Sequence, residues 1–105
     1  MAGVYHDYHD GEVVCEGYVA RPGGGPAPAV LVAHQWAGQS DQERHTADRI
    51  AALGYVGIAL DVYGKGRRGE HGTPTAAEVN GALMTPFVED RAMLRRRLSA
   101  AVDFA

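Results

Sequence analysis

The sequence predicts an α/β fold built around a parallel βαβ unit. Two short, uncharged apolar runs, residues 29–33 and 55–60, are typical of strands that are buried on both faces of a sheet. Between them lies a segment with helical periodicity, which begins at a capping signal and ends at a glycine. A strand, a helix and a second strand in this order predict one right-handed crossover.

The predicted elements start with a strand from Val13 to Val19, which ends in a glycine- and proline-rich turn at residues 21–26. The crossover helix begins at Ser40, because Ser40-Asp-Gln-Glu43 has the form of a capping box, in which the two side chains satisfy each other's backbone donors. Gly54 occupies the position after the helix where a left-handed residue is favoured.

Two more helices are predicted after a glycine-rich, basic loop at residues 64–69. Thr75-Ala-Ala-Glu78 has the form of a second capping box and predicts a short helix to about Met84. Pro86 favours the first turn of a third helix. The apolar residues on one face of that helix are Phe87, Leu94, Leu98, Ala101, Val102 and Ala105. No helix-stop signal precedes the last residue, so we expect residues 1–105 to be the N-terminal portion of a single α/β domain, with no second domain.

Composition excludes several classes of function. The chain has 105 residues with 10 basic and 13 acidic side chains, a formal charge of −3, which disfavours binding to nucleic acid. No apolar run is long enough to cross a bilayer, and the N-terminus lacks the basic and apolar regions of a secretory signal. The single cysteine, Cys15, cannot form an internal disulfide. We therefore expect a cytoplasmic protein that binds neither nucleic acid nor membranes.

Three segments in order resemble the dienelactone hydrolase family, which has the α/β-hydrolase fold. They are Val30-Leu-Val-Ala-His-Gln-Trp-Ala-Gly38, Thr46-Ala-Asp-Arg-Ile-Ala-Ala-Leu-Gly-Tyr-Val56 and Ala59-Leu-Asp-Val-Tyr-Gly-Lys-Gly66. Val88-Glu-Asp-Arg91 and the helix after it resemble the family's approach to the strand that carries the nucleophile. The resemblance implies the N-terminal part of an α/β-hydrolase sheet, truncated before the nucleophile strand. Indeed the sequence contains no G-x-C-x-G or G-x-S-x-G motif.

The resemblance also implies half of an oxyanion hole in the loop after residues 29–33. In the family one backbone N–H of the hole comes from this loop, and the matching donor here is Trp36. The position before it is usually a glutamate that contacts the nucleophile, whereas this chain has Gln35. Glutamine has a similar shape but does not titrate, so we expect activation of the nucleophile without a carboxylate gate. The alternative is that Gln35 only caps the loop.

By this resemblance the complete protein hydrolyses carboxylic esters or lactones without a cofactor or metal. Its cysteine or serine nucleophile, its aspartate and its histidine lie outside the sequence, so we expect the 105 residues to be inactive alone. The substrate-binding residues are not identified. The alternative function is a non-catalytic α/β module that binds a partner chain through an exposed sheet edge. An unpaired apolar strand at residues 29–33 also predicts self-association or pairing with the missing C-terminal half.

We expect the remaining candidate side chains to have structural roles, although each could also have a functional one. His6 and His9 are capable of binding a metal but lack an anchored third ligand. A buried thiol is expected for Cys15, and structural roles are expected for His34 and Asp61 at the ends of strands. The basic side chains are expected to be solvated rather than to bind an anion: Lys65, Arg67 and Arg68 in the loop, and Arg95, Arg96 and Arg97 on the third helix.

Overall fold

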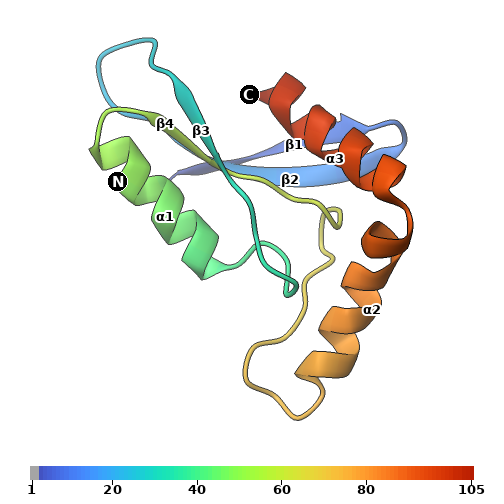
Figure 1. Ribbon diagram of the computed structural model, residues 1–105. Coiled ribbons are helices and arrows are strands. Elements are labelled where there is room, and N and C mark those ends of the chain that lie inside the picture. Colours follow the sequence, from blue (N-terminus) through green and yellow to red (C-terminus); the bar gives the residue numbers. More distant parts are fainter. Residues whose placement is uncertain (1–2) are drawn as a thin grey trace.

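A computed structural model describes residues 3–105. Met1 and Ala2, part of the N-terminal segment expected to carry no secretory signal, lie outside the described residues. The elements are β1 (Val4–Asp10), β2 (Val13–Ala20), β3 (Ala29–Val32), α1 (Asp41–Ala52), β4 (Val56–Ala59), α2 (Ala76–Glu89) and α3 (Arg91–Phe104). The strands form one sheet in the order β1-β2-β4-β3 (Figure 1). Strands β3 and β4 are parallel, and the other two neighbouring pairs are antiparallel.

The predicted βαβ unit is confirmed as β3, α1 and β4. Ser40 and Glu43 form the expected capping box, in which the Ser40 backbone N–H donates to the Glu43 carboxylate at 2.8 Å. The helix passes very close to the sheet at Gly57, where an added Cβ would overlap the backbone of Ala47. Glycine at this position therefore lets β4 and α1 approach each other.

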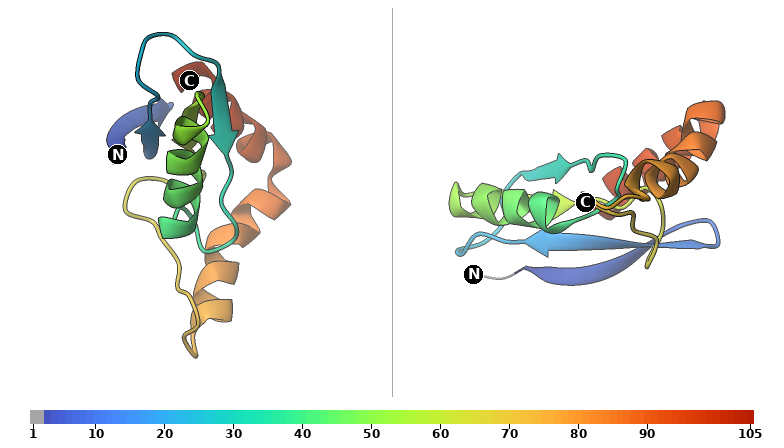
Figure 2. Two further views of the ribbon diagram at one scale, coloured as in Figure 1. Left: turned by 90° about the vertical axis from the view of Figure 1, so that its left-hand side faces the viewer. Right: turned by 90° about the horizontal axis from the view of Figure 1, so that it is seen from below.

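Helices cover the two faces of the sheet. Helix α1 packs on one face, against Tyr18, Ala20 and Ala59. Helix α3 lies across the other face (Figure 2). There Phe104 stacks on Tyr8 with a centroid distance of 4.7 Å. Alternate side chains of β2 point to these two layers because successive residues of a strand face opposite sides.

Strand β1 was not predicted from the sequence. Its seven residues pair with β2 in register from Val4 with Val19 to Asp10 with Val13. The segment has a mixture of polar residues and lacks the apolar alternation of a typical strand; only Tyr8 is buried in it. Strand β1 is stabilised by its pairing with β2, so the local propensity of its residues indicated a strand only weakly.

The boundary between the last two helices differs from the prediction. Pro86 lies inside α2, which continues to Glu89, and it does not begin a new helix. The predicted second capping box is absent, because Thr75 makes no side-chain cap hydrogen bond. Helix α3 is capped by Asp90, whose carboxylate accepts from the Met93 N–H at 3.0 Å. The Asp90 cap therefore marks the start of α3, whereas Pro86 is accommodated inside α2.

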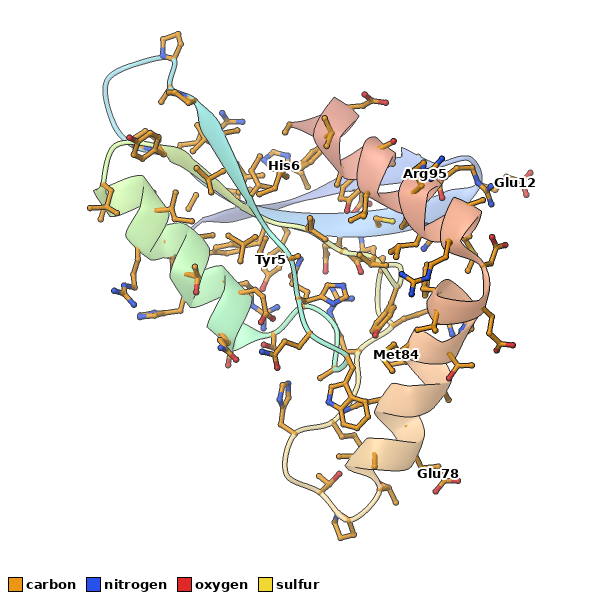
Figure 3. All side chains as sticks on the ribbon, in the orientation of Figure 1. Tyr5, His6, Glu12, Glu78, Met84 and Arg95 are labelled. Atoms are coloured by element: carbon orange, nitrogen blue, oxygen red, sulfur yellow. The ribbon has the colours of Figure 1, made fainter. Side chains whose placement is uncertain are left out.

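The buried face of α3 also differs in part from the prediction. Ala101 is buried as expected, and so is Phe87, which lies in α2 and not in α3, whereas Leu98 and Val102 are 38% and 60% exposed. Arg97, expected in solvent, is only 6% exposed: it donates to the Asp10 carboxylate at 2.9 Å and to the Val62 carbonyl at 2.6 Å. Arg95 and Arg96 remain exposed, and Figure 3 shows Arg95 in the first half of α3, near the hairpin turn that carries Glu12.

Across residues 3–105, none of the helices combines the length and apolar character needed to span a bilayer.

Candidate active-site loop

The loop after β3, residues 33–39, lies at the carboxyl end of the parallel strands. It runs beside the segment that follows β4, residues 60–64 (Figure 1). In open α/β sheets this edge is where ligands bind. The site is therefore built from two neighbouring loops that leave the sheet in the same direction.

The loop begins with a tight turn from Gln35 to Gly38. The Gly38 N–H donates to the Gln35 carbonyl at 3.0 Å, and Gly38 has a positive φ of 83°. Glycine adopts this conformation without strain. A Cβ at Gly38 would also lie 3.1 Å from the Tyr63 ring, so the turn and this ring are closely packed.

The later carbonyls of the loop are held by donors from neighbouring segments. The Tyr63 hydroxyl donates to the Trp36 carbonyl at 2.8 Å, and the Gly69 N–H donates to the Ala37 carbonyl at 2.6 Å. Gln39 is buried, and its amide donates to the carbonyls of Glu16 and Ala59 at 2.8 and 3.0 Å. These contacts fix the loop to β2, β4 and the segment after β4.

His34 connects the same two loops through both of its ring nitrogens. Nδ1 lies 2.7 Å from the Gln35 carbonyl, and Nε2 accepts from the Val62 N–H at 2.9 Å. Because a carbonyl can only accept and an amide N–H can only donate, these partners assign the neutral tautomer with the proton on Nδ1. Burial lowers the pKa of His34 below its usual value, which favours the same neutral form.

The two predicted site residues both belong to this turn: Trp36, expected as the oxyanion-hole donor, and Gln35, expected next to the nucleophile. The Trp36 side chain is 42% exposed, and its N–H donates no hydrogen bond to any part of the chain within residues 3–105. The Gln35 side chain is exposed and has no hydrogen-bond partner among those residues. The capping contacts of residue 35 are therefore made by its carbonyl, not by its amide side chain.

Asp61 is fully buried beside this site and has a structural environment. Its carboxylate accepts from the Glu16 N–H at 2.8 Å and the Gly64 N–H at 3.0 Å, and it lies 3.5 Å from Arg68. These donors satisfy the buried charge. The geometry supports the structural interpretation of Asp61 over a catalytic one.

Cys15 is also fully buried, on the α3 side of the sheet. Burial raises the pKa of its thiol to about 11. Since the thiolate is the nucleophilic form, a thiol with this pKa is almost entirely protonated and unreactive at neutral pH. Cys15 is therefore a packing residue, as the sequence interpretation expected.

The basic loop is less solvated than predicted. Lys65 forms an ion pair with Asp7 at 3.0 Å, and the Arg68 side chain is 25% exposed and lies 3.6 Å from Glu16. Of the three predicted basic side chains, Lys65 and Arg67 are exposed as expected, and Arg68 is the exception. Neighbouring carboxylates thus neutralise much of the charge that an anion would need.

The histidines of β1 do not form a metal centre with other ligands. His6 and His9 are separated by three positions on a strand, and so point to opposite faces. Within residues 3–105, no three side chains of the ligating types come together around a common point.

Tyr63 and Gln39 support the loop but were not predicted from the sequence. Both are buried by tertiary contacts with segments more than 15 residues away. The one available signal was position: Tyr63 follows a predicted buried strand, at the edge where the loop emerges. Nothing in a single sequence identifies which carbonyl its hydroxyl contacts.

Comparison with known proteins agrees with this geometry. Residues 15–105 match the model of the dienelactone hydrolase family. The chain belongs to the dienelactone hydrolase family. The resemblance of the three sequence segments is thereby confirmed. Among curated proteins none matches the sequence.

Two solved structures are similar to this family member. One is a dienelactone hydrolase-like promiscuous phosphotriesterase, P91, from metagenomic libraries, with a TM-score of 0.86 and 30% identity over 97% of this chain. The other, m3DLH, has a TM-score of 0.85 and 31% identity over 96% of this chain. In each case the chain spans 41% of the length of the similar structure. The mixed α/β fold is therefore that of part of a dienelactone hydrolase-like domain.

Proposed function

We propose that this chain supplies the oxyanion loop of a hydrolase that acts on carboxylic esters or lactones. The observation that carries the proposal is the turn at residues 35–38. Its carbonyls are held by neighbouring donors, while the Trp36 N–H has no partner among the described residues. An N–H held in this way, at the ligand-binding edge of an α/β sheet, is suited to stabilise a developing negative charge.

The proposed reaction begins when a cysteine or serine attacks the carbonyl carbon of the substrate. The carbonyl oxygen becomes an oxyanion, and the Trp36 N–H donates one hydrogen bond to it. The second donor is the N–H of the residue after the nucleophile, as in other α/β-hydrolases. An aspartate-oriented histidine takes the proton of the nucleophile and gives it to the leaving-group oxygen as the acyl C–O bond breaks. Water then attacks the acyl-enzyme with the same histidine as base, which releases the carboxylic acid and restores the nucleophile. No cofactor or metal enters this scheme.

The chain alone is proposed to be inactive, because it contains no nucleophile elbow and its one thiol is buried. One test is to incubate the isolated chain with p-nitrophenyl acetate beside Cys15→Ala. We expect no turnover by either protein. Turnover by the wild-type chain that is lost in Cys15→Ala would overturn the assignment of the nucleophile to a segment outside this chain.

A chimera tests the proposed function itself. In it, this chain replaces the matching 41% of the P91 phosphotriesterase, whose remaining segment is expected to provide the nucleophile. We expect the chimera to hydrolyse p-nitrophenyl acetate and a lactone. A phosphotriester is included as a second substrate because that relative is described as a phosphotriesterase. A folded chimera that hydrolyses none of these substrates contradicts the proposal.

The second candidate function is a non-catalytic module that binds a partner chain through β3. Strand β3 is at the end of the sheet, and Val30 on it is 39% exposed. The backbone groups on the β4 side already form hydrogen bonds, since the carbonyls of Pro28 and Val32 accept from the N–H groups of Val56 and Leu60. The backbone N–H and C=O groups of the alternate residues, Ala29, Leu31 and Ala33, point away from β4, toward the side where a partner chain would pair. This candidate is favoured if a stable complex with another protein forms and the chimera is inactive.

We also propose that the protein works in the cytoplasm. The support is the single buried thiol, Cys15, which needs no oxidising compartment. Fractionation of cells that express the natural gene would test it, and recovery of the protein from a secreted fraction would contradict it.

A further inference from the structure

The orientation of the Trp36 N–H is determined by the carbonyl that precedes it. In a trans peptide the C=O of residue 35 and the N–H of residue 36 lie in one plane and point in opposite directions. No cis peptide bond occurs within residues 3–105. Any group that holds the Gln35 carbonyl on one side of the loop therefore directs the Trp36 N–H to the other side.

Two donors hold the Gln35 carbonyl. The Gly38 N–H closes the turn at 3.0 Å, and His34 Nδ1–H contacts the same oxygen at 2.7 Å. The next peptide plane is held independently, because the Tyr63 hydroxyl donates to the Trp36 carbonyl. The Trp36 N–H thus belongs to a peptide plane whose carbonyl is fixed, and the carbonyl of the following peptide plane is fixed as well.

His34 is itself fixed on its far side. Its Nε2 accepts from the Val62 N–H, and its ring packs on Tyr63 with a centroid distance of 4.9 Å. The ring therefore links the segment after β4 to the Gln35 carbonyl and fixes the position of one relative to the other. An alanine at this position would remove both hydrogen bonds, whereas glutamine has one donor and one acceptor with which to replace them.

We propose that His34 is a positioning residue that orients the Trp36 N–H toward the reacting carbonyl, with Tyr63 as its partner. The proposal rests on the proposed function and adds to it a residue that touches neither substrate nor nucleophile. It gives His34 a role through its two hydrogen bonds, in place of the purely structural role expected from the sequence.

The same geometry makes the loop sensitive to acid. Nδ1 already carries a proton, so protonation of the ring adds an N–H at Nε2. Nε2 then no longer accepts the hydrogen bond from the Val62 N–H, because two donors face each other. The charged groups that act on His34 are Glu43 of α1, Asp61 of the segment after β4 and Arg68 of the basic loop. Their charges partly oppose one another, and burial is the largest influence, lowering the pKa of His34. Protonation should therefore begin below the ordinary histidine range and release the turn.

Nuclear magnetic resonance of the isolated, ¹⁵N-labelled chain tests the positioning without any need for activity. The ring nitrogens of His34 should show the Nδ1–H tautomer at pH 7. The Trp36 amide resonance should move on acidification, with a midpoint below 6.5. This movement should be absent in His34→Gln and unchanged in His45→Gln, an exposed histidine of α1 that serves as the matched control. An Nε2–H tautomer, or the same titration of Trp36 in His34→Gln, would overturn the proposal.

Kinetics of the chimera distinguish positioning from support of the fold. His34→Ala should lower kcat by about 10- to 100-fold with little change in KM, and His34→Gln should restore most of the loss, since the donor acts in the transition state. Tyr63→Phe should lower kcat in the same way but to a smaller extent. Wild-type kcat in folded His34→Ala contradicts the proposal. If the wild-type chimera is inactive, the proposed function fails, and the resonance experiment alone decides the role of His34.

Discussion

At the scale of single residues, the side chain and the backbone of Gln35 have different environments, and His34 contributes to this difference. The Gln35 side chain is exposed and has no partner among the described residues, while the carbonyl of the same residue receives two hydrogen bonds. Under the proposed function, the glutamine side chain is free to contact the nucleophile. It can orient a thiol or hydroxyl, but it cannot exchange a proton with it.

The substitution Gln35→Glu in the active chimera tests whether this side chain contacts the nucleophile. We expect the new carboxylate to add or shift one ionisation in the pH profile of kcat/KM, because a carboxylate beside a thiol or hydroxyl changes its proton affinity. Gln42→Glu, a similar change at an exposed position of α1, should leave the profile unchanged. If the Gln35→Glu profile equals that of wild type, residue 35 does not contact the nucleophile.

His34 also links this site to stability. Because burial lowers its pKa in the folded state, the unfolded chain binds more protons between the two pKa values. Its contribution to the free energy of unfolding is therefore complete above the unfolded value of 6.5 and is lost as the pH falls below it. Denaturant titrations at pH 7.5 and 5 should show a smaller loss in His34→Gln than in wild type. This comparison accompanies the resonance experiment and uses the same proteins.

At the scale of elements, the sequence was informative where local signals and tertiary contacts agree. The apolar runs and the Ser40 capping box predicted β3, α1 and β4 to within a residue or two. They failed for β1, whose stability comes from pairing with β2, and for Pro86, which α2 accommodates. For the site, position in the motif indicated Trp36 and Gln35. The hydrogen bonds from His34 and Tyr63 depend on how two loops meet, which a single sequence does not specify.

The two edges of the sheet differ in a way that predicts how the chain associates. Strand β1 carries charged and polar side chains such as Asp7, whereas the exposed residues of β3 are Ala29 and Val30. Uncharged, apolar edge strands pair readily with other chains, and charges prevent this. We therefore expect the isolated chain to associate through β3.

Sedimentation velocity over a range of concentrations measures this association. The wild-type chain should form dimers or larger species. Val30→Lys should shift it toward monomer, because lysine blocks an edge strand. Val4→Lys, the same change on the exposed end of β1, should leave the association unchanged. A folded wild-type monomer at high concentration would contradict the prediction.

At the scale of the whole molecule, the chain corresponds to part of a dienelactone hydrolase-like domain, and under the proposed function it supplies one wall of the active site. It spans 41% of the two similar structures, and its residues 15–105 match the dienelactone hydrolase family. Helix α1 and helix α3 enclose the sheet from opposite sides, and the loops at residues 33–39 and 60–64 meet at one edge (Figure 2). In the proposed function, the catalytic contribution of this chain is the placement of the Trp36 backbone N–H.

The N–H of residue 36 can be removed without changing any other residue of the loop. In the chimera with the P91 segment, Trp36→Pro deletes the N–H at this position because proline has no backbone donor, while Trp36→Phe retains it. The measurement is kcat for p-nitrophenyl acetate, with circular dichroism to verify that each variant is folded. We predict that Trp36→Pro lowers kcat by about 10²- to 10³-fold, the effect of losing one oxyanion donor, and that Trp36→Phe keeps most of the activity. A folded Trp36→Pro variant with the kcat of wild type would contradict the account.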